Sequence, residues 1–66
     1  MQVWINGECR ELTVGARVPD ALGVLGVPGR GVAVAVDGEV VPRAVWAETE
    51  LNEGARVEVL TAVQGG

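Results

Sequence analysis

The sequence predicts an α+β domain in which one helix crosses a mixed sheet of four to five strands. Three observations carry this prediction. Short segments alternate apolar and polar residues, one segment places apolar residues at helical spacing, and Asn-Gly and Asp-Gly pairs separate strand-like segments. A chain of 66 residues makes one domain at most and buries only about 60% of its unfolded surface. We expect the domain to span residues 1–63, with a tail at 64–66.

A hairpin is predicted at the amino-terminal end of the chain. Apolar and polar residues alternate over residues 2–6, as in a half-buried strand. Asn6-Gly7 favours a two-residue turn, because both residues tolerate a positive φ. The returning strand is expected over residues 8–14, with Leu12 and Val14 facing the core.

A short helix is predicted over residues 18–25, where apolar residues recur at helical spacing. Pro19 suits the first turn, because its missing N–H has no helical partner there. Gly26 is a favourable C-cap, and Pro28 prevents the helix from resuming. Arg17 is a poor N-cap because its side chain offers no short oxygen acceptor. We therefore expect this helix to depend on packing.

The second half contains another hairpin and a final strand. A Val/Ala strand at residues 32–36 is followed by the turn Asp37-Gly38 and a return over residues 39–43. Residues 44–51 look irregular, with room for one helical turn, and the last strand is expected over 56–63. If the first and last strands are neighbours, the order β-β-α-β-β-β gives the β-grasp, or ubiquitin-like, fold.

Composition excludes several function classes. The net charge is −4, and the five positive charges are all arginines scattered along the chain, which argues against nucleic-acid binding. The chain lacks histidine and has one cysteine, Cys9, so we expect neither a catalytic centre nor a metal site. There is no apolar run of membrane-spanning length and no basic leader, so we expect no membrane contact and a cytoplasmic location.

The carboxyl-terminal residues are the strongest candidate for chemistry. Gln64, Gly65 and Gly66 follow the last predicted strand and reach roughly 10 Å when extended. Glycine lacks a Cβ atom, so such a tail can enter a narrow slot in another protein. We expect a flexible tail that presents the Gly66 carboxylate. A carboxylate is a poor electrophile, so a partner must activate it, for example as an acyl-adenylate.

Several stretches resemble the ThiS family, the sulfur carriers of thiamin (thiazole) biosynthesis. They are the Asn6-Gly7-Glu8 turn, the Val/Ala strand at 32–36, the segment at 41–49 and the closing segment at 54–66. The Val-Pro-Arg-Ala-Val-Trp run within 41–49 is the most family-specific of them. The resemblance covers the entire chain and implies a non-enzymatic carrier with a β-grasp fold.

The resemblance also implies a reaction cycle and its partners. A ThiF-like enzyme would adenylate the Gly66 carboxylate with ATP and magnesium, so the carrier itself would bind no cofactor. Sulfur would come from a persulfide supplied by a cysteine desulfurase pathway, giving a Gly66 thiocarboxylate. Thiazole synthase, the ThiG enzyme, would accept that sulfur and release the carboxylate.

A partner-binding face is predicted on the open side of the sheet. Trp4 has the opposite parity to the core residues of its strand, and Leu60 shares the outward parity of Glu58. If the first and last strands are adjacent, Trp4 and Leu60 form an apolar patch that an adenylating enzyme can recognise. The simpler alternative is that they are ordinary exposed apolar residues. For Trp46 we expect a lid over the core, and for Cys9 a packing role in preference to a sulfur relay.

Other carriers share the same ending. Candidates are the small subunit of molybdopterin synthase, carriers for tRNA thiolation or cysteine synthesis, and a ubiquitin-like modifier. A plain interaction domain would need the fold and not the tail. The approach to the glycines is Thr-Ala-Val-Gln and lacks the proline-rich character of the molybdopterin carriers, which favours the thiamin carrier.

Overall fold

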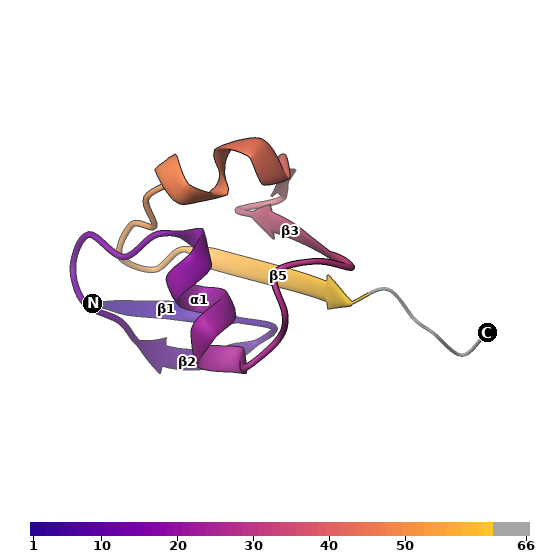
Figure 1. Cartoon of the computed structure of the whole chain (residues 1–66). Coiled ribbons are helices and arrows are strands. Elements are labelled where there is room, and N and C mark those ends of the chain that lie inside the picture. Colours follow the sequence, from indigo (N-terminus) through magenta and orange to yellow (C-terminus); the bar gives the residue numbers. More distant parts are fainter. Residues whose placement is uncertain (62–66) are drawn as a thin grey trace.

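Five strands form one mixed sheet in the order β2-β1-β5-β3-β4, and helix α1 lies across one of its faces (Figure 1). The structure is a computed structural model that describes residues 1–61. The elements are β1 (Gln2–Ile5), β2 (Glu8–Glu11), α1 (Val18–Leu25), β3 (Val32–Val36), β4 (Glu39–Val40), the 3₁₀-helix η1 (Arg43–Glu48) and β5 (Arg56–Thr61). The α+β class and the single crossing helix are therefore confirmed. The domain boundary predicted at residue 63 lies outside the described residues.

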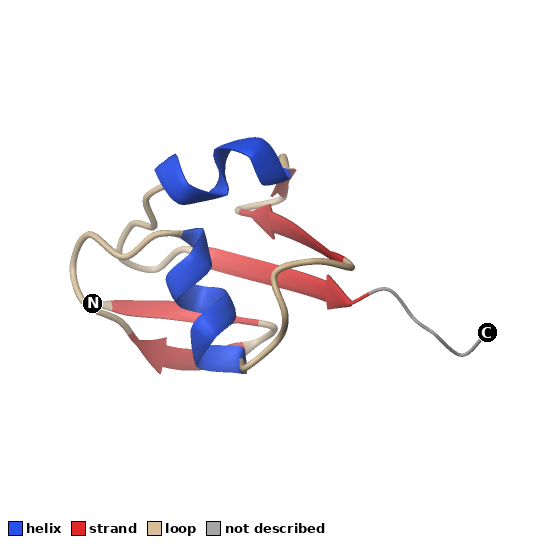
Figure 2. Ribbon diagram, viewed as in Figure 1, coloured by secondary structure: helices blue, strands red, loops and turns tan. Residues whose placement is uncertain are grey.

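The sheet is organised around β5, which lies between β1 and β3. Strand β1 runs parallel to β5, with Trp4 opposite Arg56, and β3 runs antiparallel to it, with Val34 opposite Val59. The first and last strands are thus neighbours, as predicted. In Figure 2 strands β1 and β2 lie behind α1, which covers the core side of the sheet.

Both hairpins turn through an Asx-Gly pair. Asn6 and Gly7 have φ values of 52° and 85°, and Asp37 and Gly38 have values of 52° and 87°. Positive φ at both positions defines a type I′ turn, whose twist matches that of the flanking strands. The two turns predicted from Asn-Gly and Asp-Gly are therefore confirmed.

The start of α1 is held by one side-chain and one backbone contact, because Arg17 itself supplies no side-chain cap. The Arg17 N–H donates to the Asp20 carboxylate at 2.7 Å, which also places a negative charge near the positive end of the helix dipole. The Val18 N–H donates to the Thr49 carbonyl at 3.1 Å and ties the first turn to the segment that precedes β5. At the other end, Gly26 caps the helix with φ 72°, as predicted.

The core lies between the sheet and the two helical segments. Its members are almost all aliphatic: Val3, Ile5, Leu12, Ala16, Val18, Ala21, Leu22, Val34, Trp46, Leu51, Ala55, Val57 and Val59. Trp46 is the only aromatic residue among them and lies on η1, which packs against α1. Its indole N–H donates to the Val41 carbonyl at 2.8 Å, so the polar edge of the ring is satisfied. The prediction that Trp46 closes one end of the core is confirmed.

Two predicted strands are too long. The strand expected over residues 8–14 ends at Glu11, and Val14, expected to face the core, is 81% exposed. The chain leaves the sheet because the Ala16 N–H closes a turn onto the Thr13 carbonyl at 2.9 Å. Leu12 is buried as predicted.

The return strand expected over residues 39–43 contains only Glu39 and Val40. Pro42 has no N–H to donate to a ladder, and it precedes η1 as the N-cap residue. The Val45 N–H donates to the Pro42 carbonyl at 3.0 Å and starts the 3₁₀-helix. This helix supplies the helical turn expected within the irregular segment.

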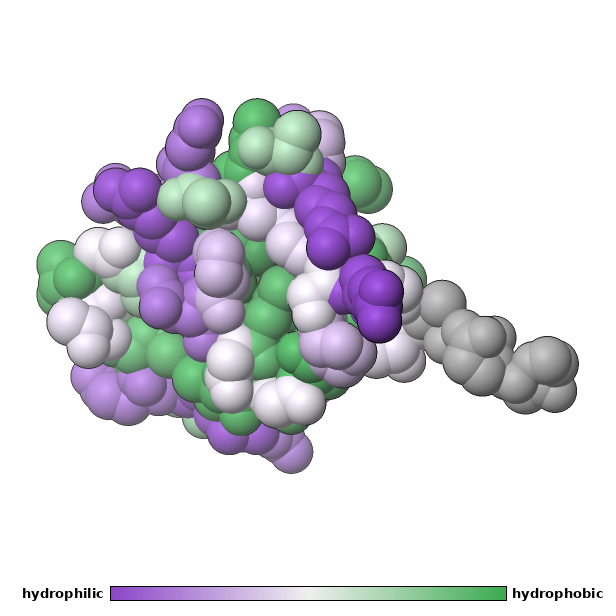
Figure 3. All heavy atoms as spheres, in the orientation of Figure 1, coloured by the Kyte–Doolittle hydropathy of each residue, from purple (hydrophilic) through white to green (hydrophobic). Residues whose placement is uncertain are grey.

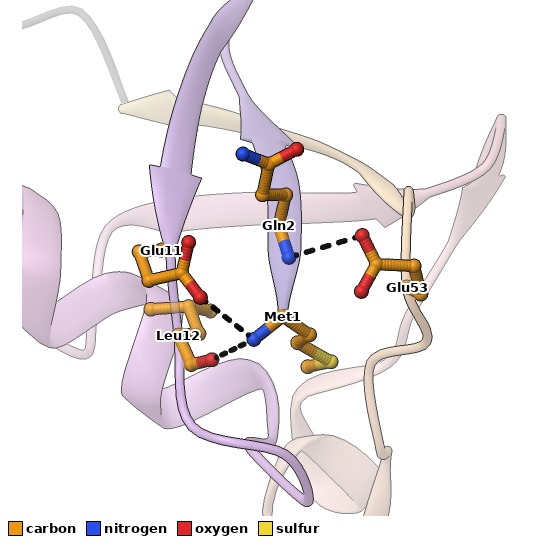
Figure 4. Close-up of polar contacts among 5 residues, drawn as sticks. All are labelled: Met1, Gln2, Glu11, Leu12 and Glu53. Carbon is orange, nitrogen blue, oxygen red and sulfur yellow. Dashed lines mark hydrogen bonds and ion pairs between the residues drawn. The ribbon is translucent and has the colours of Figure 1, made fainter.

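The start of β1 is held on both sides (Figure 4). The amino group of Met1 donates to the Glu11 carboxylate at 3.0 Å and to the Leu12 carbonyl at 2.7 Å. On the opposite side, the Gln2 N–H donates to the Glu53 carboxylate at 3.2 Å. These contacts fix the strand that lies directly beside β5.

Candidate functional site

The predicted reactive residue, Gly66, and the predicted tail residues Gln64 and Gly65 lie outside the described residues. The structure does describe the strand that leads toward them. Strand β5 ends at Thr61 and is paired with β3 as far as that residue. Because β1 and β5 are parallel, the Asn6-Gly7 turn lies at the same end of the sheet as Thr61. The tail therefore continues from a central strand at the end of the sheet that carries the first hairpin turn.

The sheet face that α1 leaves uncovered, here called the open face, carries the predicted partner-binding residues. Trp4 is 44% exposed and Leu60 is 70% exposed, and Glu58 is exposed between core residues of β5. Their parity is opposite to that of the buried residues of β1 and β5. The structure therefore places all three on one face, as expected, while their role in binding stays a prediction.

The register separates the two apolar side chains on the open face. Trp4 lies opposite Arg56, whereas Leu60 lies four residues further along β5, opposite Ala33. At about 3.3 Å per residue, this offset is about 13 Å along the strand. Glu58 lies between them, so Trp4 and Leu60 form two apolar positions around a carboxylate and not one continuous patch.

A shallow hollow of about 430 Å³ lies beside Trp4 on this face. Its lining includes Gly7 and Val57 and the charged residues Arg56 and Glu58. An indole beside a guanidinium and a carboxylate offers an apolar contact surface together with charges of both signs. Such a surface can recognise a partner that presents an apolar side chain flanked by complementary charges.

A second concave surface lies between α1 and η1, on the face shown in Figure 3. This groove of about 440 Å³ is lined by apolar residues that include Leu22, Val27 and Trp46, with Arg43 at its edge. The Arg43 guanidinium lies 5.8 Å from the centre of the Trp46 ring, a cation–π distance. Because Leu22 and Trp46 are core residues, packing of the two helices accounts for this apolar lining.

Within residues 1–61, no group of three or more His, Cys, Asp or Glu side chains is arranged to hold a metal ion. Cys9 is a free, exposed thiol on β2, opposite Trp4 in the register, so it does not fill the packing role expected for it. No helix in this part of the chain is long and apolar enough to cross a membrane.

Two residues of this region were not singled out from the sequence. Arg56 has the same parity along β5 as Glu58 and Leu60, so the alternation of this strand could have predicted that it lies on the same face. The Asn6 side chain forms two hydrogen bonds to Val59, a residue 53 positions away. No pattern in the sequence indicates this contact, because turn formation alone accounts for an asparagine before a glycine.

Comparison with known proteins identifies the family. The ThiS family model matches residues 3–66. The chain is 27% identical to the sulfur carrier protein ThiS of Escherichia coli, with both chains covered completely. It is 38% identical over 64 residues to the sulfur carrier protein ThiS of Thermus thermophilus, covering 97% of this chain and 98% of that one.

Two further likenesses concern a longer protein and the fold. A thiazole synthase of Paramagnetospirillum magneticum is 38% identical over 66 residues, and this chain spans only 20% of its length. The crystal structure of the thiamine biosynthesis protein ThiS of Geobacter metallireducens superposes with a TM-score of 0.81 at 29% identity, with both chains fully covered. These matches confirm the β-grasp fold and the family expected from the sequence. The chain belongs to the ThiS family.

Proposed function

We propose that this chain is a sulfur carrier for the thiazole step of thiamin synthesis and that its reactive group is the carboxylate of Gly66. The observation that carries the proposal is the family match, which extends through the Gly65-Gly66 ending. Two relatives that match this chain over almost their whole length are named sulfur carriers, which supports the same role here. The fold supports it further, because the central strand β5 leads directly toward that ending.

The chemistry begins with activation of the carboxylate. A carboxylate oxygen of Gly66 attacks the α-phosphorus of ATP, pyrophosphate leaves, and an acyl-adenylate forms. A persulfide, formed from cysteine by a desulfurase, attacks the acyl carbon and AMP leaves with the former carboxylate oxygen. A second thiol then reduces the resulting acyl disulfide and becomes part of a disulfide itself. The product is a thiocarboxylate on Gly66.

In this scheme the partners supply the catalytic groups. A ThiF-like enzyme binds ATP and magnesium, so the carrier acts as a co-substrate and needs no cofactor of its own. The carrier contributes an acyl group and a surface by which it is recognised.

Thiazole synthase is the proposed acceptor of the sulfur. A relative of that name includes a stretch similar to the whole of this chain. Carrying both parts on one polypeptide raises their effective concentration, so such a fusion favours partners that act together. Chemically loaded carrier is therefore expected to return to its carboxylate mass when thiazole synthase and its other substrates are added. A loaded carrier that keeps its sulfur under these conditions, and gives it up to another sulfur-accepting enzyme, would assign it to a different pathway.

The activation step can be tested by pyrophosphate exchange. The ThiF-like enzyme of the same organism should incorporate labelled pyrophosphate into ATP only when this chain is present, because the acyl-adenylate forms reversibly. Exchange that is equally fast without the carrier would show that the chain is not the adenylated substrate.

Replacing Trp4 by alanine is expected to weaken binding to the adenylating enzyme by about 2 kcal/mol, or about thirtyfold in Kd, if Trp4 anchors the interface. Folding should be retained, because Trp4 is on the open face and half exposed. Val24→Ala is the matched control, because Val24 is 41% exposed on the helix that covers the opposite face. A calorimetric titration in which Trp4→Ala and Val24→Ala bind as tightly as the wild type would rule out this docking site.

A further inference from the structure

The parallel pairing of β1 with β5 stops before β5 does. The last backbone bond between them runs from the Asn6 N–H to the Val57 carbonyl at 2.9 Å. Strand β1 ends at Ile5, whereas β5 continues to Thr61. The next residue of β5 that faces this edge is Val59. Its N–H and carbonyl therefore need a partner other than strand β1.

The side chain of Asn6 provides that partner. The Val59 N–H donates to the Asn6 Oδ1 at 2.8 Å, and the Asn6 Nδ2 donates to the Val59 carbonyl at 3.2 Å. Both bonds are partly buried. One carboxamide thus reproduces the acceptor and the donor that two successive ladder positions of a longer β1 would have offered. The positive φ of Asn6, 52°, takes its backbone into the turn while its side chain continues the ladder.

The other hairpin turn holds the opposite end of β5 in a different way. The Asp37 N–H donates to the Arg56 carbonyl at 2.8 Å, and the Arg56 N–H donates to the Asp37 Oδ1 at 3.0 Å. At this turn the backbone N–H of Asp37 donates to the Arg56 carbonyl, so the Asp37 side chain needs only to accept the hydrogen bond from the Arg56 N–H. At the first turn the Asn6 side chain must both donate to the Val59 carbonyl and accept from the Val59 N–H. A carboxylate therefore fits position 37, whereas position 6 requires a carboxamide.

We propose that Asn6 is a positioning residue for the loading of Gly66: its carboxamide holds the carboxyl end of β5 and so fixes where the chain leaves the sheet. This inference rests on the proposed function. A docked carrier presents its tail from the end of β5, so the position of that strand end relative to the Trp4 surface sets the point from which the tail reaches the partner's active site. Displacements of about 1 Å can cost about a hundredfold in rate, so a loosened strand end is expected to lower turnover.

Replacing Asn6 by aspartate and, in a separate variant, Asp37 by asparagine distinguishes the roles of the two turns. Asn6→Asp removes the donor to the Val59 carbonyl and places a carboxylate oxygen against it, whereas Asp37→Asn keeps the acceptor for Arg56. Asn6→Gly preserves the positive φ of the turn and removes both side-chain bonds. We expect amide hydrogen exchange at Val59 to accelerate about tenfold in Asn6→Asp and Asn6→Gly and to stay near the wild-type rate in Asp37→Asn.

The pH dependence of Asn6→Asp gives a second signature. A protonated carboxyl group can donate to the Val59 carbonyl and accept from the Val59 N–H, as the carboxamide does. The protection of Val59, corrected for intrinsic exchange, should therefore approach the wild-type value as the pH falls through the pKa of the introduced group. Asn6→Gly should show no such recovery. An unchanged Val59 exchange rate in both Asn6 variants would overturn the inference.

The kinetic readout is pyrophosphate exchange by the adenylating enzyme. Asn6→Asp and Asn6→Gly should lower kcat about tenfold and leave KM within about threefold, because the Trp4 surface is intact. A change confined to KM would make Asn6 a docking contact and overturn the positioning role. Normal turnover of the wild type and of both variants would also overturn it. If the wild type itself supports no exchange, the proposed function fails, and the positioning role fails with it.

Discussion

Replacing Trp46 by alanine is expected to lower the free energy of unfolding by about 3–5 kcal/mol. Trp46 is 7% exposed and is the only aromatic residue in the core of the described domain. Its removal opens a large cavity between η1 and α1 and leaves the Val41 carbonyl without its indole donor. At roughly 0.05–0.15 kcal/mol per residue, a domain of this size has a total stability of roughly 3–10 kcal/mol. The loss is therefore at least about a third of the stability of the domain, so the variant should unfold at a much lower urea concentration than the wild type.

Trp46→Phe distinguishes the packing contribution from the hydrogen bond. It keeps most of the ring volume and removes the N–H, so we expect a loss of about 1–2 kcal/mol. Urea denaturation followed by circular dichroism is the appropriate measurement, because fluorescence would lose one of the two tryptophans of the chain. If Trp46→Ala unfolds within about 1 kcal/mol of the wild type, Trp46 does not close the core.

Removing Gly66 is expected to abolish loading and to leave the fold intact. The shortened chain ends on Gly65 and presents the same chemical group, but about 3.3–3.6 Å short of its position in the full chain. Since an error of about 1 Å can cost about a hundredfold, adenylation should fall at least a hundredfold. The core residues of the described domain lie between Val3 and Val59, so the thermal midpoint should not change.

Gly66→Ala is the matched variant for this deletion. It keeps the length of the chain and adds one methyl group next to the reacting carboxylate. We expect a smaller loss than for the deletion, because the carboxylate still reaches its position and only the space around the backbone is reduced. Equal adenylation of the full-length and shortened chains would show that loading does not depend on Gly66 and would contradict this prediction.

Local patterns predicted most of the fold correctly. The Asn-Gly and Asp-Gly turns carried their own conformational requirement, and the apolar spacing of residues 18–25 matches α1. The errors occurred where a local turn or a proline ended a strand earlier than the alternation of its residues predicts. Val14 continues the alternation of its strand, but the turn closed by Ala16 takes it into solvent. Nothing in the alternation itself marks that point.

The partner-binding face could be predicted in part. Parity along a strand placed Trp4, Glu58 and Leu60 on one side of the sheet, because side chains alternate strictly between its faces. The register between β1 and β5 is a long-range property, and it separates Trp4 from Leu60 and brings Arg56 beside Trp4. The Asn6 contact with Val59 depends on the same register. The sequence therefore indicated which face carries the candidate residues but not how they are spaced.

The most direct test of the carrier role is the intact mass of the chain after loading. The purified chain should be incubated with the ThiF-like enzyme, ATP, magnesium and a persulfide-generating desulfurase with cysteine and a reducing thiol. We predict a mass gain equal to the replacement of one oxygen by one sulfur, located on Gly66 by fragmentation and absent without ATP. A wild-type mass that stays unchanged while a known ThiS carrier gains sulfur in a parallel reaction with its own adenylating enzyme would contradict the proposed function.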